Sequence, residues 1–181
     1  MPTRDEVRKL FPMLDEMKDE TLREQVVDVW KDAMDEGGWE INDLDDIPFT
    51  LLVATDVNLL AHTVGVTKVA MAIGDSLMET YDGKIPVNRD YLIAGGILHD
   101  VGKLVEYERQ AGKIVKSQCG KDLRHPFSGT ALAFRRDVPT AVCHLIAVHA
   151  REGEGVRMSP EAIIINHADF SNFEPLKLMA R

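Results

Sequence analysis

The sequence predicts an all-α protein, a bundle of about six to eight helices with a small β-hairpin near residues 105–117. Three observations support this prediction. Apolar residues recur at three- and four-residue spacing along most of the chain. Capping residues stand before several of these segments, and glycines stand after them. Outside the hairpin segment, almost no stretch alternates apolar and polar residues as a half-buried strand would.

The first fifty residues are predicted to form two helices and a loop. Residues 3–18 have the spacing of a short amphipathic helix, which Pro12 kinks or ends early. A second helix starts near Asp19, runs to Met34 and ends at two glycines. The acidic stretch from Trp39 to Pro48 is expected to be a loop. Residues 1–50 contain no pattern that is typical of a functional site, so we expect them to pack on the core.

The middle of the chain predicts two helices that bring polar side chains to the interior. From about Pro48 to Tyr81 the pattern is helical, with a break near residues 55–58. His62 lies on the apolar stripe of this segment and therefore faces inward. The next helix follows the cap Asn88-Arg-Asp90 and carries a histidine-aspartate pair at its end.

The last third of the chain begins with the predicted hairpin and continues in helices. Pro126 suits the first position of a helix within residues 121–137. Two more helices are expected, one from Pro139 through His149 and one from Ser159 through Asp169.

The histidine-aspartate pair is His99-Asp100. It follows an apolar, glycine-containing stretch from Tyr91 to Leu98, which is expected to be buried. A buried carboxylate without a cationic partner is costly. The partner could be Lys103, an arginine, or a metal ion, for which histidine and aspartate are ordinary ligands.

Several predicted helices bring such ligand-type side chains to the interior. One inward histidine is usually a core imidazole bonded to a backbone carbonyl, but this explanation does not suffice for four of the six histidines. Helical bundles build metal sites from side chains of facing helices. The candidate ligands are His62, His99, Asp100, His125, His149 and Asp169.

Composition excludes several classes of function. A net charge of −9 argues against a general nucleic-acid binder. No apolar run is long enough to span a membrane, and the N-terminus lacks the apolar core of a signal peptide. The two cysteines have no zinc-motif spacing and indicate a reducing compartment. We expect a cytoplasmic protein with a small-molecule substrate, and a homodimer is compatible with the sequence.

The order H…HD…D resembles that of the HD-domain metal-dependent phosphohydrolase superfamily. The segment Leu98–Lys103 looks like the HDxGK form of the motif, and Arg124–Gly129 resembles the HPxxG-like segment of many members. The resemblance covers roughly residues 55–172. It implies an orthogonal helical HD domain over residues 51–181, with residues 1–50 as N-terminal helices of the same structural unit.

The resemblance also implies a ligand set. His62, His99, Asp100 and Asp169 would bind one divalent metal, and Asp100 would bridge to a second metal held by His125 and His149. Such mixed sites accept Fe, Mn, Co, Zn or Ni. A metal-activated hydroxide would be the nucleophile, because the acidic residues that other members carry shortly after HD are replaced by Gly102-Lys103.

Other features narrow the implied activity. His149 is followed by Ala150 where HD-GYP phosphodiesterases carry a paired histidine, so a cyclic dinucleotide substrate is not favoured. Lys103 could act on a phosphate oxygen or form a salt bridge with Asp100 or Asp169. Arg124 is a weaker candidate for a phosphate contact.

The sequence therefore predicts a phosphohydrolase for a phosphomonoester or phosphodiester of a small metabolite or nucleotide. Asp100 and Lys103 are its candidate catalytic residues, and Lys103 and Arg124 its candidate substrate contacts. Two alternatives stay open: an HD-type di-iron oxygenase, and a non-catalytic metal-binding sensor module.

Overall fold

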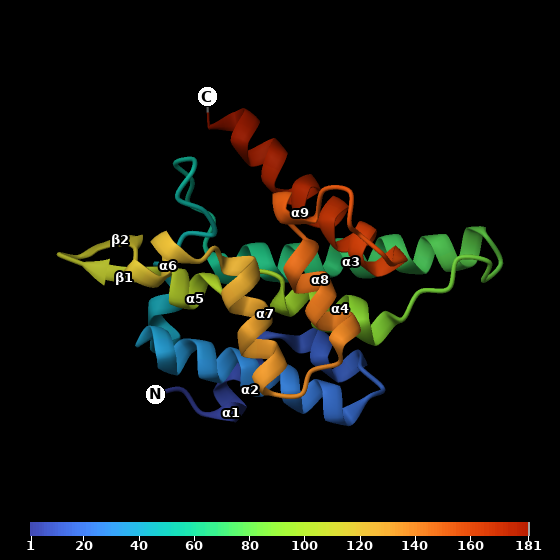
Figure 1. Ribbon diagram of the computed structural model, residues 1–181, viewed down its shortest axis with the longest axis horizontal. Coiled ribbons are helices and arrows are strands. Elements are labelled where there is room, and N and C mark those ends of the chain that lie inside the picture. The colour runs from blue at the N-terminus through green and yellow to red at the C-terminus, as the bar shows by residue number, and fades with distance from the viewer. Residues whose placement is uncertain (181) are drawn as a thin grey trace.

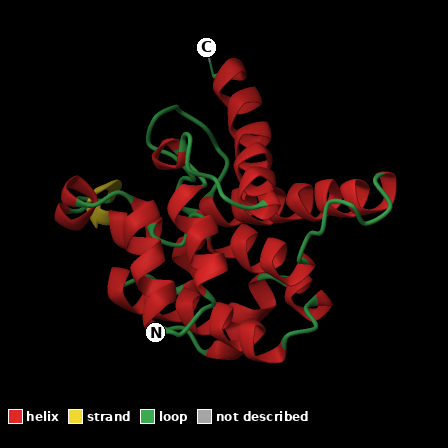
Figure 2. Cartoon of the chain, turned by 45° about the vertical axis from the view of Figure 1, so that its right-hand side comes forward, coloured by secondary structure: helices red, strands yellow, loops and turns green. Residues whose placement is uncertain are grey.

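The computed structural model describes residues 1–180. Its α-helices are α1 (Arg4–Leu10), α2 (Glu20–Gly37), α3 (Leu59–Thr80), α4 (Arg89–Leu98), α5 (Lys103–Glu106), α6 (Gln118–Asp122), α7 (His125–Arg135), α8 (Thr140–Val148) and α9 (Pro160–Met179). Short 3-10 helices lie at Pro12–Glu16, Ile41–Asp45 and Arg151–Gly153. Strands β1 (Tyr107–Gln110) and β2 (Lys113–Lys116) form one antiparallel hairpin. Figure 2 shows how completely helices dominate, which confirms the predicted all-α class and its small hairpin.

The helices cross one another instead of lying parallel. In Figure 1, α7 and α8 run across α2 and α3, and α9 crosses α3 before its C-terminal half projects from the bundle. The hairpin extends from one end of the molecule. Helix α4 lies in the middle and packs against α2, α3, α8 and α9. This arrangement confirms the predicted orthogonal helical bundle and places the end of α4 at its centre.

The N-terminal elements are fixed to the segment that carries His99-Asp100. Trp30 of α2 donates its indole N–H to the Ile97 carbonyl, and Trp39 donates its own to the Leu104 carbonyl. The helix expected over residues 3–18 is interrupted at Pro12, where a 3-10 turn begins. The expected loop after α2 also contains a 3-10 turn.

The helix predicted from Pro48 is wrong over its first part, because α3 begins only after the Asn58 cap. In the preceding segment, the hydroxyls of Thr50 and Thr55 each accept a hydrogen bond from the backbone N–H of the residue two positions later. Such local bonds compete with helix formation. The ends of the segment are also paired, since Phe49 N–H donates to the Val57 carbonyl. Residues 48–58 are therefore a closed loop.

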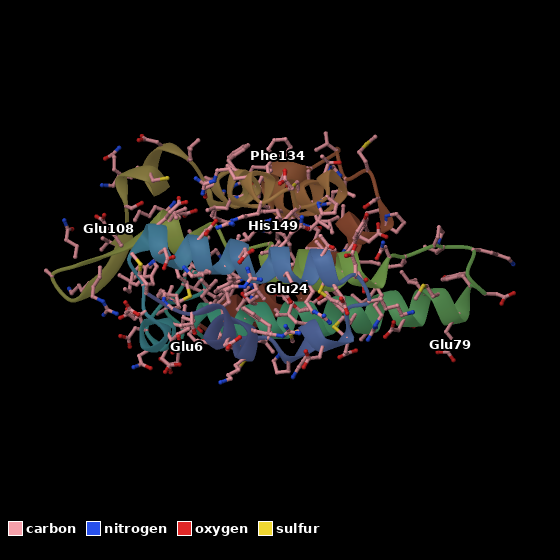
Figure 3. The ribbon with its side chains drawn as sticks, turned by 90° about the horizontal axis from the view of Figure 1, so that it is seen from below. Glu6, Glu24, Glu79, Glu108, Phe134 and His149 are labelled. Atoms are coloured by element: carbon pink, nitrogen blue, oxygen red, sulfur yellow. The ribbon has the colours of Figure 1, made fainter. Side chains whose placement is uncertain are left out.

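Exposed charged side chains lie at the ends of the molecule, whereas the histidine at the end of α8 is buried. Figure 3 shows Glu79 and Glu108 projecting from opposite ends of the molecule, whereas His149 lies among the helices. Among the described residues, no helix is both long and apolar enough to cross a membrane.

Candidate metal centre

Two glycines of α4 allow three helices to meet at the candidate site. A Cβ atom on Gly96 would lie 2.8 Å from the Cα of Thr67 in α3. One on Gly95 would lie 2.6 Å from a methyl group of Leu145 in α8. Only glycine permits such close approach without a shift of the neighbour. The pair therefore brings α3 and α8, with their histidines, against the end of α4.

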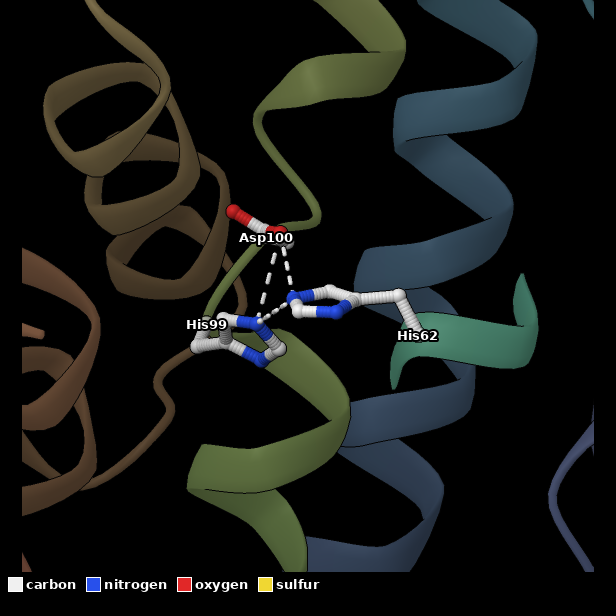
Figure 4. Close-up of side chains that lie close together, drawn as sticks. All are labelled: His62, His99 and Asp100. Atoms are coloured by element: carbon white, nitrogen blue, oxygen red, sulfur yellow. Dashed lines mark hydrogen bonds and ion pairs between the residues drawn. The ribbon is translucent and has the colours of Figure 1, made fainter. Parts of the chain in front are cut away.

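Asp100 lies at the centre of the site, is 1% exposed, and presents its two carboxylate oxygens to different neighbours. Its Oδ2 atom lies 3.5 Å from His62 Nε2 and 3.3 Å from His99 Nε2. Figure 4 shows these three side chains converging from α3 and from the end of α4. Asp169 of α9 completes what we call the first group, with Oδ1 3.1 Å from His62 Nε2.

The other oxygen of Asp100 faces two further histidines. Its Oδ1 atom lies 3.2 Å from His125 Nε2 and 3.6 Å from His149 Nε2. These two residues, which we call the second group, come from the start of α7 and the end of α8. The candidate ligand atoms of Asp100, His125 and His149 all lie within 4.8 Å of one another, as do those of Asp100, His62 and His99.

Three of the four imidazoles are oriented through their second nitrogen. Nδ1 of His99 lies 2.6 Å from the Gly96 carbonyl, and Nδ1 of His149 lies 2.7 Å from the Ile146 carbonyl. Nδ1 of His125 lies 2.8 Å from a carboxylate oxygen of Glu106. Because these partners are acceptors, each Nδ1 donates a hydrogen bond to its partner, and Nε2 is the ring nitrogen that faces Asp100. A metal ion would therefore be bound through Nε2.

Lys103 supplies one positive charge to the site. Its ammonium lies 2.6 Å from Asp100 Oδ2 and 2.5 Å from the Phe49 carbonyl oxygen. The structure thus forms the salt bridge with Asp100 that was one of the two sequence-based interpretations. Asp169 has no such lysine contact among the described residues, and its oxygen faces His62 alone.

The charges of the site shift its pKa values. Burial would raise the pKa of Asp100, but the charges of Lys103 and His99 hold it well below its usual range. Burial lowers the pKa of His62 and lowers that of His125 to about 4. Burial is the largest influence on His99 and lowers its pKa, but the charge and hydrogen bond of Asp100 and the charge of Asp169 together outweigh burial and raise it. Mixed imidazole and ionised carboxylate donors of this kind fit a divalent transition metal.

Arg124 and the two remaining histidines lie outside these two groups. Arg124 is 45% exposed and pairs with Glu152, 3.1 Å away. His144 accepts the backbone N–H of Met158, and His167 is exposed on α9.

Sequence reasoning missed two residues that support the site. Phe49, in the loop expected to be helical, stacks on the His62 ring with centroids 4.5 Å apart. Glu106 is buried and bonds both the backbone N–H and the ring of His125. No acidic residue stands directly after His99-Asp100, but Glu106 follows six residues after Asp100. No motif marks Glu106 within Val105-Glu-Tyr-Glu-Arg, so the sequence did not distinguish it from the nearby Glu108.

Comparisons with known proteins agree with this geometry. A family model described as HD domain matches residues 59–170. The curated dihydroneopterin 2',3'-cyclic phosphate phosphodiesterase of Methanocaldococcus jannaschii is 31% identical over 169 residues, which cover 90% of this chain and 67% of that protein. No solved structure matches the chain. With its H…HD…D residues gathered at one buried site, the chain belongs to the HD-domain family and is a hydrolase of that superfamily.

Proposed function

We propose that this protein is a metal-dependent phosphodiesterase that hydrolyses a cyclic phosphodiester of a small metabolite. One observation carries the proposal: the buried carboxylate of Asp100 directs one oxygen to each of two groups of metal-ligand side chains. The activity for which the Methanocaldococcus jannaschii relative is named supports a 2',3'-cyclic phosphate as the substrate.

The proposed ligands follow from the two groups. His62, His99, Asp100 and Asp169 would hold one divalent ion, and Asp100, His125 and His149 would hold the other. Their imidazole nitrogens and carboxylate oxygens suit Fe, Mn, Co, Zn or Ni. Bound divalent ions supply a water of lowered pKa and positive charge for phosphoryl oxygens.

Lys103 has two roles in this proposal. Its contacts with Asp100 and the Phe49 carbonyl use two of the three ammonium N–H donors. The ion pair holds Asp100 in place, and the third donor is available to a phosphoryl oxygen of the substrate. The lysine would stabilise negative charge that develops on the phosphoryl group.

Arg124 would act at the edge of the site. It precedes His125 directly and is exposed, so a phosphate approaching the second group would pass close to it. Its guanidinium would have to exchange the carboxylate of Glu152 for the phosphate. This exchange would cost more than at a fully exposed ion pair, because the Glu152 side chain is only 17% exposed.

The test is a metal-reconstitution assay. Protein stripped with a chelator is loaded separately with each of the five metals and given dihydroneopterin 2',3'-cyclic phosphate, a nucleoside 2',3'-cyclic phosphate and the matching phosphomonoesters. We expect ring opening of a cyclic phosphate that depends on added metal. Hydrolysis that survives complete removal of metal, or no hydrolysis with any metal, would contradict the proposal.

The same assay separates the two alternatives raised by the sequence. Repeating it without oxygen leaves a hydrolase unaffected and stops a di-iron oxygenase. A sensor module would bind metal or substrate without turnover in either atmosphere. Activity that is equal with and without oxygen is the result that we expect.

A further inference from the structure

We infer that Glu106 is a positioning residue that orients His125 and thereby controls metal binding by the second group alone. This inference rests on the proposed function, because it concerns an ion that His125 would help to hold. It assigns Glu106 no contact with the substrate or with Asp100.

The contacts of Glu106 fix His125 at two points. One oxygen, Oε2, accepts the backbone N–H of His125 at 2.6 Å and its Nδ1–H at 2.8 Å. The first contact holds the start of α7, and the second holds the ring in a single rotation and tautomer. Together they direct Nε2 of His125 to its position 3.2 Å from Asp100 Oδ1.

The second oxygen of Glu106 is also engaged. Oε1 lies 3.0 Å from the ammonium of Lys116, whose side chain is 44% exposed, whereas that of Glu106 is 4% exposed. Burial would raise the pKa of Glu106, but its contacts with His125 and Lys116 lower it to about 2. A general base must be able to reach the proton that it removes. Because both oxygens of Glu106 are engaged by other groups, its geometry fits orientation of His125 and not proton abstraction.

The hairpin and α6 hold Glu106 in this position. Ser117, which follows β2, donates its backbone N–H to the Glu106 carbonyl at 2.9 Å and its hydroxyl to the Val105 carbonyl at 2.8 Å. Gly120 of α6 packs so closely that a Cβ atom there would lie 2.2 Å from the Glu106 carbonyl oxygen. The hairpin end of the molecule therefore supports one ligand of the second group (Figure 1).

The first group lacks this support. Nδ1 of His99 bonds a carbonyl of its own helix, and Nδ1 of His62 is buried without a partner among the described residues. A change at Glu106 should therefore leave the first ion in place. Loss of a carboxylate that orients a ligand histidine typically weakens metal binding by about 10- to 100-fold.

The experiment is an equilibrium titration of chelator-treated protein with Mn²⁺, in which electron paramagnetic resonance reports the free ion. It compares the wild type with Glu106→Gln and with Glu108→Gln, which changes an exposed glutamate two residues later, in strand β1. We expect two bound ions in the wild type and in Glu108→Gln. In Glu106→Gln the first ion should bind as in the wild type, and the second about 10- to 100-fold more weakly.

Several results would overturn the inference. Two ions bound with wild-type affinity by Glu106→Gln would remove any role for Glu106, and equal weakening of both ions would make its role merely structural. Should Glu106→Gln fail to fold, as judged by circular dichroism, Glu106→Asp replaces it. That variant keeps the buried charge but shortens its reach, so the same selective loss of the second ion is expected.

The titration also distinguishes this inference from the proposed function. A wild type that binds no Mn²⁺ and hydrolyses no cyclic phosphate would contradict both. A wild type that is active and binds two ions, beside a Glu106→Gln variant with unchanged binding, would contradict only the role of Glu106.

Discussion

The two groups around Asp100 are built differently, although they share its carboxylate. The first group comes from long helices, α3 and α9, and from the end of α4, which all cross at the centre of the bundle. The second group comes from the start of α7 and the end of α8, and one of its histidines depends on the hairpin end of the molecule through Glu106. The crossing helices of the core therefore position the first group, and the hairpin end of the molecule supports the second group.

The two groups also differ in charge. Asp169 gives the first group a second carboxylate, whereas the second group adds only the imidazole rings of His125 and His149 to Asp100. Anionic ligands bind a divalent cation more strongly than neutral ones of the same geometry. We therefore expect the first ion to bind more tightly than the second.

The largest effect is expected from a change at the shared residue. Asp100→Asn keeps the shape of the side chain but removes the charge that both groups use, so it should abolish binding of both ions and reduce hydrolysis to background. Elemental analysis and the cyclic phosphate assay measure the two effects. Asp45→Asn, which changes an exposed aspartate far along the chain, is the matched control and should behave as the wild type. Retention of one tightly bound ion by Asp100→Asn would show that the groups do not share this carboxylate.

A change within one group should affect one ion. His149→Asn removes a ligand of the second group whose ring is held by the Ile146 carbonyl, so bound metal should fall from two equivalents to one. His62→Asn should instead remove the more tightly held ion. Elemental analysis should find one ion in each variant, and the Mn²⁺ titration should find the retained ion more tightly bound in His149→Asn than in His62→Asn. Equal affinity of the retained ion in the two variants would contradict the division into two groups.

The glycine of the HDxGK motif offers a smaller perturbation. A Cβ atom on Gly102 would lie 2.2 Å from the His125 carbonyl oxygen and 2.7 Å from the Gly129 nitrogen, so α7 must shift in Gly102→Ala. We expect a loss of about 1–3 kcal/mol in the free energy of unfolding, and weaker binding of the second ion with the first retained. Chemical denaturation and the Mn²⁺ titration measure these effects. An unchanged free energy of unfolding would contradict the close contact between Gly102 and α7.

The smallest expected difference concerns pH. In the metal-free protein the pKa of His99 is raised above 6.5, so a proton must leave its ring before the first ion binds. Affinity for the first ion should therefore rise with pH, by up to about tenfold per pH unit below that pKa. The pKa of His125 is lowered to about 4, so this ring is already neutral near pH 7 and adds no such dependence to the second ion. Titrations between about pH 6 and 8 test the contrast, and a steeper dependence for the second ion would contradict it.

The first group could be predicted from sequence and the support of the second could not. His62 and Asp169 lie on apolar helical stripes, and the crossing of regular helices is enough to bring such residues to one interior. Phe49 and Glu106 lie in short irregular segments, where the backbone follows local hydrogen bonds that leave no periodic pattern. Thr50 and Thr55 turned a predicted helix into a loop in this way. Similarly, only tertiary contact separates the buried Glu106 from the exposed Glu108 two residues later.

The central claim is that Asp100 joins two metal positions, and an anomalous-difference map from crystals of the Mn²⁺-loaded protein tests it most directly. The account predicts two peaks on opposite sides of the Asp100 carboxylate, one among His62, His99 and Asp169 and one beside His125 and His149. A single peak held without Asp100, or peaks remote from this carboxylate, would contradict it.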